Sequence, residues 1–261
     1  IKYKKIFDNQ RTFVVGEIGL NHNGKIKNCI KMIDIAKKSG FDAVKLQISD
    51  PNESYFPKTK SYNYFKKYSL SEEKLVKVFN YAKQRKIILF STFGDLKSLK
   101  YQDKFNFPLI KISSGLITNI PLIKKIAQKN KPIILSTGMA TLDEIQHATE
   151  VLHNNGCEDP TLLHCTSAYP TPYNEANLSA IEAIRKATGC NVGWSDHTVN
   201  PLLIYSAIKN HNANYIELHV DLDGKGWESM GGQHCWLPSQ VKNLMSYLSN
   251  EKKIDGIFGK K

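Results

Sequence analysis

The sequence predicts a TIM (β/α)8 barrel, an α/β fold that forms a single domain over residues 1–261. Three observations lead to this prediction. Short runs of β-branched and apolar residues alternate with longer segments of helical period, which is typical of a parallel sheet. There are eight runs and eight helical segments. No internal repeat, low-complexity linker or sign of a second domain interrupts the alternation.

The strand candidates share a short apolar core and a polar residue at or just after the end of the run. In order, we expect strands at 12–18, 42–48, 87–92, 109–113, 132–136, 161–165, 191–195 and 215–219. Residues in such a run alternate between the two faces of the sheet, so a polar residue near the end can point into the barrel.

The helix candidates share a 3.6-residue apolar period, and several begin with a capping signal. Examples of that signal are Ser71-Glu72-Glu73 and Thr141-Leu142-Asp143-Glu144. In order, we expect helices near 26–39, 72–85, 95–103, 119–129, 141–153, 174–187, 200–210 and 238–249.

A doubly wound sheet is the competing fold. It usually carries a glycine-rich phosphate loop after its first strand, and the stretch Gly16-Glu17-Ile18-Gly19-Leu20-Asn21 does not match G-x-G-x-x-G. The barrel is therefore favoured. The longest irregular stretches are expected at 49–70 and 221–237, after strand ends where barrel lids are found.

Composition favours a cytoplasmic protein that does not enter a membrane. No apolar run approaches the roughly 20 residues that cross a bilayer. The start Ile1-Lys2-Tyr3-Lys4-Lys5 lacks the apolar segment of a secretory signal. The five cysteines are scattered and never form C-x-x-C, so we expect thiols rather than disulfides or a thiolate zinc site: Cys29, Cys157, Cys165, Cys190 and Cys235.

The net charge of +12 raises the question of nucleic acid. The lysines are spread along the chain in pairs, such as Lys37-Lys38 and Lys124-Lys125, on expected helix faces. This pattern favours a solvated surface over a nucleic-acid interface. A positive field would also favour an anionic substrate.

The expected carboxyl ends of the strands are unusually polar, and barrel active sites are built at these ends. Lys45 and Lys111 lie inside otherwise apolar runs, and a buried ammonium needs an anion nearby. With the neighbouring hydroxyls and the turns Ser114-Gly115 and Thr137-Gly138, they suit a ligand that carries phosphate and carboxylate. Helix capping explains any one of these serines or threonines alone.

The stretch Gly193-Trp194-Ser195-Asp196-His197-Thr198 places a serine, an acid and a histidine side by side. Adjacent strand residues point in alternating directions, so these three do not make a hydrolase triad. We expect Ser195 and His197 to share one side and Asp196 to face away.

His197 and His219 close neighbouring strands, which is metal-ligand geometry suited to Mn²⁺, Fe²⁺, Co²⁺ or Zn²⁺ rather than Ca²⁺. A structural role for both remains the alternative. His22, His164 and His234 are secondary candidates.

Seven motifs together resemble the sialic acid synthase family, in order and spacing, from about residue 10 to 245: GEIGLNHNG (16–24), KLQ (45–47), KISSG (111–115), LSTGM (135–139), LLHCTSAYPTP (162–172), VGWSDHT (192–198) and IELH (216–219). This family condenses phosphoenolpyruvate with an amino-sugar aldehyde to give N-acetylneuraminate, legionaminate or pseudaminate, and its fold is a TIM barrel.

The resemblance implies roles for particular residues. Those that match positions holding phosphoenolpyruvate are Lys45, Thr92, Lys111, Ser114, Ser136, Ser167 and Ser195. Glu17, Gln47 and Tyr169 match the sugar side, with Glu17 a candidate for proton handling. His197 and His219 match the ligands of a divalent cation, Mn²⁺ first with Mg²⁺ or Co²⁺ as alternatives. The residues expected to act in catalysis are Glu17, Lys45, Lys111, His197 and His219.

The resemblance also implies a course for the reaction. The cation polarises the aldehyde, C3 of phosphoenolpyruvate attacks it, water adds at C2, and phosphate leaves by cleavage of the C–O bond. The substrates would be phosphoenolpyruvate and an N-acetylmannosamine-like sugar.

Three departures from the family pattern bear on the identity of the sugar. Leu116 stands where relatives have a glutamate, Phe93-Gly94 follows Ser91-Thr92 in place of Pro-Phe, and Gly231-Gly232-Gln233 replaces Gly-Pro-Asp in a longer loop that includes Glu228. Nothing after Gly256 is expected to form the antifreeze-like domain of many relatives. The resemblance further implies a homodimer.

Two alternatives to the synthase stay open at this point. One is a metal-dependent barrel hydrolase or isomerase that uses His197 and His219. The other is a barrel that binds sugar without turning it over.

Overall fold

The computed structural model describes residues 12–226, 228 and 233–254. The interpretations of residues 1–5, of Gly231 and Gly232, and of the chain after Gly256 lie outside these residues. Among the described helices, none combines the length and the hydrophobicity needed to cross a bilayer.

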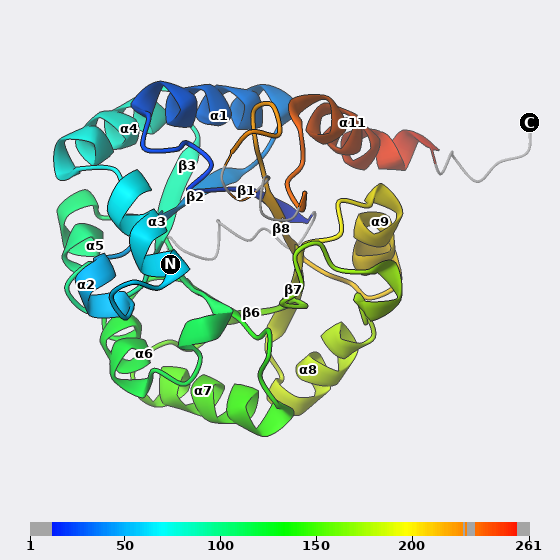
Figure 1. The fold of residues 1–261 in the computed structure, drawn as a ribbon. Helices are drawn as coiled ribbons and strands as arrows, with labels where there is room; N and C mark the ends of the chain where they lie inside the picture. Colours follow the sequence, from blue (N-terminus) through cyan, green and yellow to red (C-terminus); the bar gives the residue numbers. More distant parts are fainter. Residues whose placement is uncertain (1–11, 227, 229–232, 255–261) are drawn as a thin grey trace, which may run out of the picture.

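Eight parallel strands form a closed barrel, and the predicted fold is confirmed (Figure 1). Neighbours in sequence pair with each other, and β1 pairs with β8 to close the sheet. The strands are β1 (Phe13–Gly19), β2 (Ala43–Ile48), β3 (Ile88–Phe93), β4 (Ile110–Ile112), β5 (Ile133–Ser136), β6 (Thr161–His164), β7 (Asn191–Asp196) and β8 (Tyr215–His219). Each overlaps the run predicted for it.

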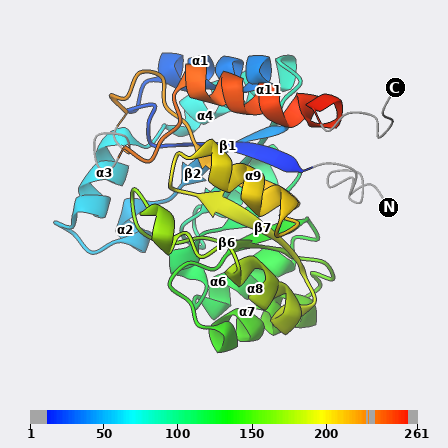
Figure 2. The ribbon, with the colours of Figure 1, turned by 90° about the vertical axis from the view of Figure 1, so that its right-hand side faces the viewer.

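Helices surround the barrel, and α11 lies beside α1, so the outer ring is continuous there (Figures 1 and 2). The predicted caps form: Ser71 accepts a hydrogen bond from the Lys74 N–H, and Thr141 and Glu144 make a reciprocal capping box. The helices of the ring are α1 (Ile26–Ser39), α4 (Glu72–Gln84), α5 (Lys100–Phe105), α6 (Ile120–Ala127), α7 (Leu142–Asn154), α8 (Ala180–Thr188), α9 (Pro201–Lys209) and α11 (Pro238–Ile254).

Two predicted helices begin later than expected. The helix predicted at 95–103 starts only at Lys100, because the Asp95 carboxylate accepts the backbone N–H groups of Ser98 at 2.6 Å and Asp50 at 2.8 Å. These bonds fold the start of the segment into a turn against the β2 loop. The helix predicted at 174–187 begins only with α8 at Ala180, and Tyr173–Glu175 form a separate 3-10 turn before it.

The stretch predicted to be irregular at 49–70 instead contains two helices, α2 (Pro51–Ser54) and α3 (Lys60–Tyr68). Thr59 caps α3, and the rings of Tyr55 and Phe65 pack with centroids 5.0 Å apart. Aromatic packing thus contributes to the order of a short, lysine-rich segment.

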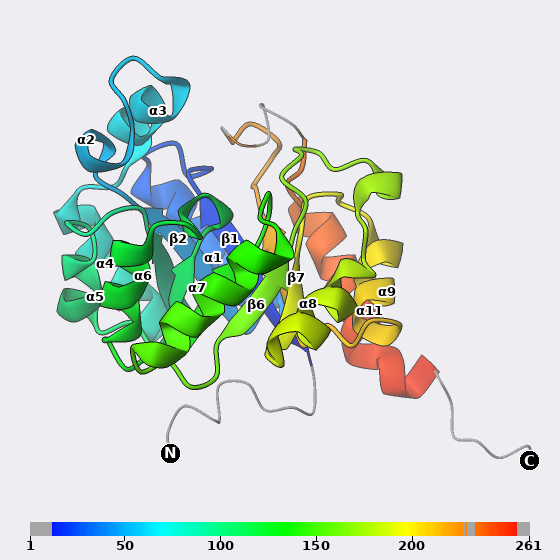
Figure 3. The same ribbon diagram turned by 90° about the horizontal axis from the view of Figure 1, so that it is seen from below.

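The carboxyl ends of the strands face α2, α3 and the described part of the loop after β8, which rise above one end of the barrel (Figure 3). In register, Glu17 lies beside Lys45, Thr92 beside Lys111, and Ser195 beside Glu217. Two residues before Glu217 on β8 is Tyr215, and its ring stacks on that of Phe13 with the centroids 5.8 Å apart. The polar layer therefore rests on an aromatic one.

Candidate active site

A cavity of about 490 Å³ opens at this end of the barrel, and all twelve residues predicted for the site line it. A cavity of that size is in the range that holds a small substrate. Tyr55 and Phe65 add an aromatic wall from the α2–α3 segment. The predicted residues on its surface are Glu17, Lys45, Gln47, Thr92, Lys111, Ser114, Ser136, Ser167, Tyr169, Ser195, His197 and His219. Their individual roles stay predictions.

Four buried charges form the floor of the cavity. Lys45 makes an ion pair with Glu17 and a second with Glu217, at 3.0 Å from its Nζ to Oε1. Lys111 Nζ lies 3.2 Å from the same Glu217 oxygen. Ser195 donates to this oxygen at 3.4 Å. The two lysines and two glutamates balance in formal charge.

This arrangement corrects one inference from sequence. Burial of Lys45 and Lys111 suggested that both need an anion from a ligand, but Glu17 and Glu217 supply the anions from within the protein. From sequence, Glu217 had no role assigned and stood only within the motif IELH. The signal for it is its place two residues before His219, which puts both side chains on the inner face of β8.

The four floor groups differ in how well their charges are compensated. Burial lowers the pKa of Lys45, but Glu17 and Glu217 outweigh it and hold that pKa above its ordinary value. Burial also lowers the pKa of Lys111, and Glu217 only partly offsets this. The pKa of Glu217 is about 2, because Lys111 and Lys45 overcome its burial, whereas burial raises the pKa of Glu17. The charge of Lys111 is thus less fully compensated than that of Lys45, and an anionic ligand would stabilise it.

Two polar atoms on the cavity wall are buried without a hydrogen-bond partner among the described residues. They are Thr92 Oγ1 and Glu17 Oε1. Buried polar atoms are nearly always paired, so both indicate a place where a ligand or water belongs. On the β4 side, Ser114 Oγ accepts the Gly138 N–H at 3.0 Å and lies 3.1 Å from Cys165 Sγ.

His197 and His219 lie on the cavity wall with their rings 5.2 Å apart. Nδ1 of His197 lies 2.8 Å from the carbonyl oxygen of Thr166, and Nδ1 of His219 lies 2.7 Å from Oε2 of Glu228. Both partners are acceptors, so each Nδ1 carries a proton, and Nε2 of the neutral ring has a free lone pair. Oriented imidazoles of this kind fit a divalent cation.

Protonation of the two imidazoles differs as well. Burial and the neighbouring His219 lower the pKa of His197 to about 3. Burial also lowers the pKa of His219, but Glu228 outweighs it and raises that pKa above its ordinary value. His197 is therefore neutral over the physiological range.

Tyr169 covers the histidines from the cavity side. Its ring centroid lies 4.3 Å from that of His197, and about half of the residue is exposed. Burial raises the pKa of the Tyr169 phenol to about 12, so the hydroxyl stays protonated and can donate a hydrogen bond.

Asp196 faces away from the cavity, as predicted, and is fully buried. Its carboxylate accepts the N–H groups of Thr198 at 2.8 Å and Val199 at 3.1 Å, and the indole Nε1–H of Trp236 at 2.8 Å. Asp196 thus fastens the end of β7 to the segment that precedes α11.

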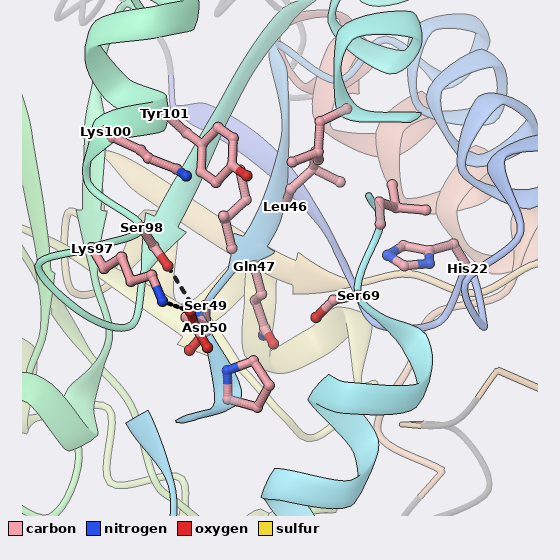
Figure 4. Close-up of a pocket in the computed structure, with 14 residues that line it drawn as sticks. His22, Leu46, Gln47, Ser49, Asp50, Ser69, Lys97, Ser98, Lys100 and Tyr101 are labelled. Atoms are coloured by element: carbon pink, nitrogen blue, oxygen red, sulfur yellow. Dashed lines mark hydrogen bonds and ion pairs between the residues drawn. The ribbon is translucent and has the colours of Figure 1, made fainter. Parts of the chain in front are cut away.

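A neighbouring cavity of about 280 Å³ lies beside β2 and shares Gln47, Ile48 and Ser49 with the first (Figure 4). His22 lines this second cavity, and its Nδ1 accepts the Gly24 N–H at 3.0 Å. His164, another secondary candidate, lies at the end of β6 and contacts the Ala176 carbonyl through Nε2 at 2.9 Å. Both have local structural partners.

Comparison with known proteins places the chain in a family. A model of the NeuB family matches residues 32–260. The chain belongs to the NeuB family. It is similar to the uncharacterized protein MJ1065 of Methanocaldococcus jannaschii, at 39% identity over 95% of this chain and 72% of that protein. It is also 36% identical to the N,N'-diacetyllegionaminic acid synthase of Campylobacter jejuni, over 95% of this chain and 78% of the synthase.

The folds of NeuB-family proteins agree with this assignment. The structure of an N-acetylneuraminic acid synthetase from Leptospira borgpetersenii superposes with a TM-score of 0.87 at 26% identity, covering 97% of this chain and 88% of that one. The expected resemblance to sialic acid synthases is therefore confirmed, and with it the expectation of a synthase-type enzyme.

Proposed function

We propose that this NeuB-family chain condenses phosphoenolpyruvate with an N-acetylmannosamine-like amino-sugar aldehyde, giving a nonulosonic acid and phosphate. The observation that carries the proposal is the single cavity lined by all twelve predicted residues, with Lys45 and Lys111 at its floor and His197 and His219 on its wall. The named relatives include a synthase of N,N'-diacetyllegionaminic acid and a synthetase of N-acetylneuraminic acid.

Phosphoenolpyruvate belongs at the Lys111 side of the cavity. Lys111 shares its carboxylate partner with Lys45, and Thr92 Oγ1 is unpaired beside it in the strand register. Further hydroxyls come from Ser114 after β4, Ser136 at the end of β5 and Ser167 after β6. Charge-assisted bonds from an ammonium and several hydroxyls suit a phosphate and a carboxylate.

The sugar belongs on the opposite wall, beside Glu17, Gln47 and Tyr169. Leu116 also lines the cavity, where relatives resembling this chain have a glutamate. An apolar side chain at that position favours a sugar with a methyl or acetamido group over one that offers a hydroxyl there.

In the reaction, C3 of phosphoenolpyruvate forms a bond to the aldehyde carbon, and the aldehyde oxygen takes up a proton. Water adds at C2, and the resulting tetrahedral carbon releases phosphate by cleavage of its C–O bond. Lys111 and the hydroxyls hold the phosphate as charge builds on it. Glu17 has a raised pKa and an unpaired Oε1, so it can exchange a proton with the sugar oxygen.

The donor set of His197 and His219 fits a divalent cation, as both rings present Nε2 with Nδ1 held by an acceptor. Such a cation would supply Lewis acidity to the aldehyde carbonyl. The resemblance implies Mn²⁺, with Mg²⁺ or Co²⁺ as alternatives. We further propose that the enzyme acts in the cytoplasm and as a homodimer.

The test is phosphate release from phosphoenolpyruvate with a panel of sugars: N-acetylmannosamine, its 2,4-diacetamido-6-deoxy counterparts and simple aldoses. Mn²⁺, Mg²⁺ and Co²⁺ are supplied in turn. The proposal expects release that requires one of the amino-sugars. Tight cation binding without phosphoenolpyruvate binding would instead favour a barrel hydrolase or isomerase, and binding of both ligands without release would favour a sugar-binding protein.

A further inference from the structure

We propose that His234 and Cys235 join His197 and His219 as ligands of one divalent cation, and that Glu228 acts by holding His219. The metal site of this chain would then contain three imidazoles and a thiolate, and the sugar aldehyde would add as a further ligand. This inference deepens the proposed function and rests on it, because the proposed function supplies the role of the cation.

The side chains concerned gather at one point beside β8. One ligand atom from each of His219, Glu228, His234 and Cys235 lies within 4.8 Å of all the others, and all four residues are buried. Two ligands of one Zn²⁺-like ion are roughly 3–4 Å apart, given bonds of about 2.0–2.3 Å. Small rotations of His219, His234 and Cys235 would therefore bring three ligand atoms onto a common ion. His197 lies outside this group, but its ring is 5.2 Å from that of His219 and can add the fourth.

The third imidazole lies beside the first two. The ring of His234 lies 4.9 Å from that of His219 and 6.0 Å from that of His197. Nδ1 of His234 is buried without a hydrogen-bond partner among the described residues. Since a buried ring nitrogen is normally paired, this atom is a second sign that a ligand belongs here.

Backbone pairing places His234 and Cys235 beside His219. Trp236 N–H donates to the carbonyl oxygen of His219 at 2.7 Å, and the Asp221 N–H donates to the Trp236 carbonyl at 3.1 Å. The Trp236 indole is in turn held by Asp196. The conformation of this segment is thus determined by the ends of β7 and β8, which also carry His197 and His219.

Glu228 is positioned independently from β1. Its Oε1 accepts the Leu20 N–H at 2.9 Å, while its Oε2 contacts His219 Nδ1. Gly19 has φ of +51°, and a Cβ there would lie only 1.9 Å from Glu228 Oε1. The glycine therefore leaves the space that this carboxylate occupies.

The ligand set has a consequence for the choice of metal. Imidazole and thiolate donors suit Zn²⁺, Fe²⁺ and Co²⁺, whereas Mg²⁺ and Mn²⁺ favour carboxylate and water oxygens. The proposed site would hold Zn²⁺, Fe²⁺ or Co²⁺ in preference to Mn²⁺ or Mg²⁺.

The test uses Co²⁺ alone, added without substrate to the full chain after chelation under anaerobic conditions. The native protein should bind one Co²⁺ and show thiolate-to-cobalt charge-transfer absorption. Cys235→Ser should abolish that absorption, and both Cys235→Ser and His234→Gln should weaken Co²⁺ binding at least tenfold. Cys157→Ser, which changes a buried thiol before β6 at the other end of the barrel, is the matched control and should keep the absorption.

Thermal unfolding of each variant shows whether it folds. If Cys235→Ser does not fold, the Co²⁺ affinity of His234→Gln decides the question. The proposal would be overturned if His234→Gln bound Co²⁺ as tightly as the native protein does. It would also be overturned if the Co²⁺-bound native protein showed no thiolate-to-cobalt absorption. These readings need no substrate, so they are separate from sugar-dependent phosphate release, which tests the proposed function.

Discussion

Replacing Glu217 by glutamine tests the charged floor of the cavity. The carboxylate is buried and faces two ammonium groups, at 3.0 Å from Lys45 and 3.2 Å from Lys111. Glutamine keeps the size and shape of the side chain but removes the charge. Lys111 would lose the only carboxylate that lies within ion-pair distance of it among the described residues.

The expected loss of stability can be worked from the site. The pKa of Glu217 is about 2, against an ordinary value of 4.5, which corresponds to roughly 3 kcal/mol in favour of the folded, ionised state. Removing one partner of a buried ion pair costs about 3–5 kcal/mol in other proteins. We therefore expect Glu217→Gln to lower the free energy of unfolding by about 3 kcal/mol, or the melting temperature by roughly 6–12 °C.

The assay is thermal unfolding of both proteins across a range of pH. Because folding lowers the pKa of Glu217, its contribution is complete above about pH 4.5 and is lost as the pH falls toward 2. The difference between native protein and variant should be constant above that range and shrink below it. The control is Glu73→Gln on α4, whose ion pair with Lys77 is exposed and should contribute nothing measurable. A loss in Glu217→Gln no larger than in the control would refute this account.

Three further variants test other parts of the site. Lys111→Met should weaken phosphoenolpyruvate binding, measured by calorimetry, about a hundredfold and leave Co²⁺ affinity unchanged. Loss of both affinities would show that the substitution disrupts the whole site. Gly19→Ala should lower both the melting temperature and the Co²⁺ affinity, because its Cβ would displace Glu228; native values for both would contradict the packing argument. Leu116→Glu should raise KM for the preferred sugar at least tenfold and leave KM for phosphoenolpyruvate unchanged. If the sugar KM of the variant equals that of the native protein, Leu116 does not contact the sugar.

Much of the barrel and of its inner surface could be predicted from sequence because both depend on short-range patterns. The two-residue period of a strand puts Lys45 and Gln47 on one face, and Ser195 and His197 on one side. Barrel geometry then brings the carboxyl ends of all strands to one mouth. This is why Thr92 and eleven residues from seven separated motifs line one cavity.

The remaining features depend on contacts between distant segments. Glu228 meets Leu20 across 208 positions, and His234 reaches His219 only through the pairing of Trp236 with the end of β8. No local period marks either contact. Helix α3 was missed for a different reason, since it is short and rich in lysine and none of its residues is buried.

The most direct test of the proposed condensation follows the oxygen that bridges C2 and phosphorus in phosphoenolpyruvate. The purified chain is incubated with ¹⁸O-labelled phosphoenolpyruvate, a divalent cation and the amino-sugar that supports phosphate release. The account predicts that the phosphate carries the label and that a 3-deoxy-2-keto sugar acid forms in equal amount, by mass spectrometry. Unlabelled phosphate accompanied by labelled pyruvate would show hydrolysis at phosphorus and contradict the account.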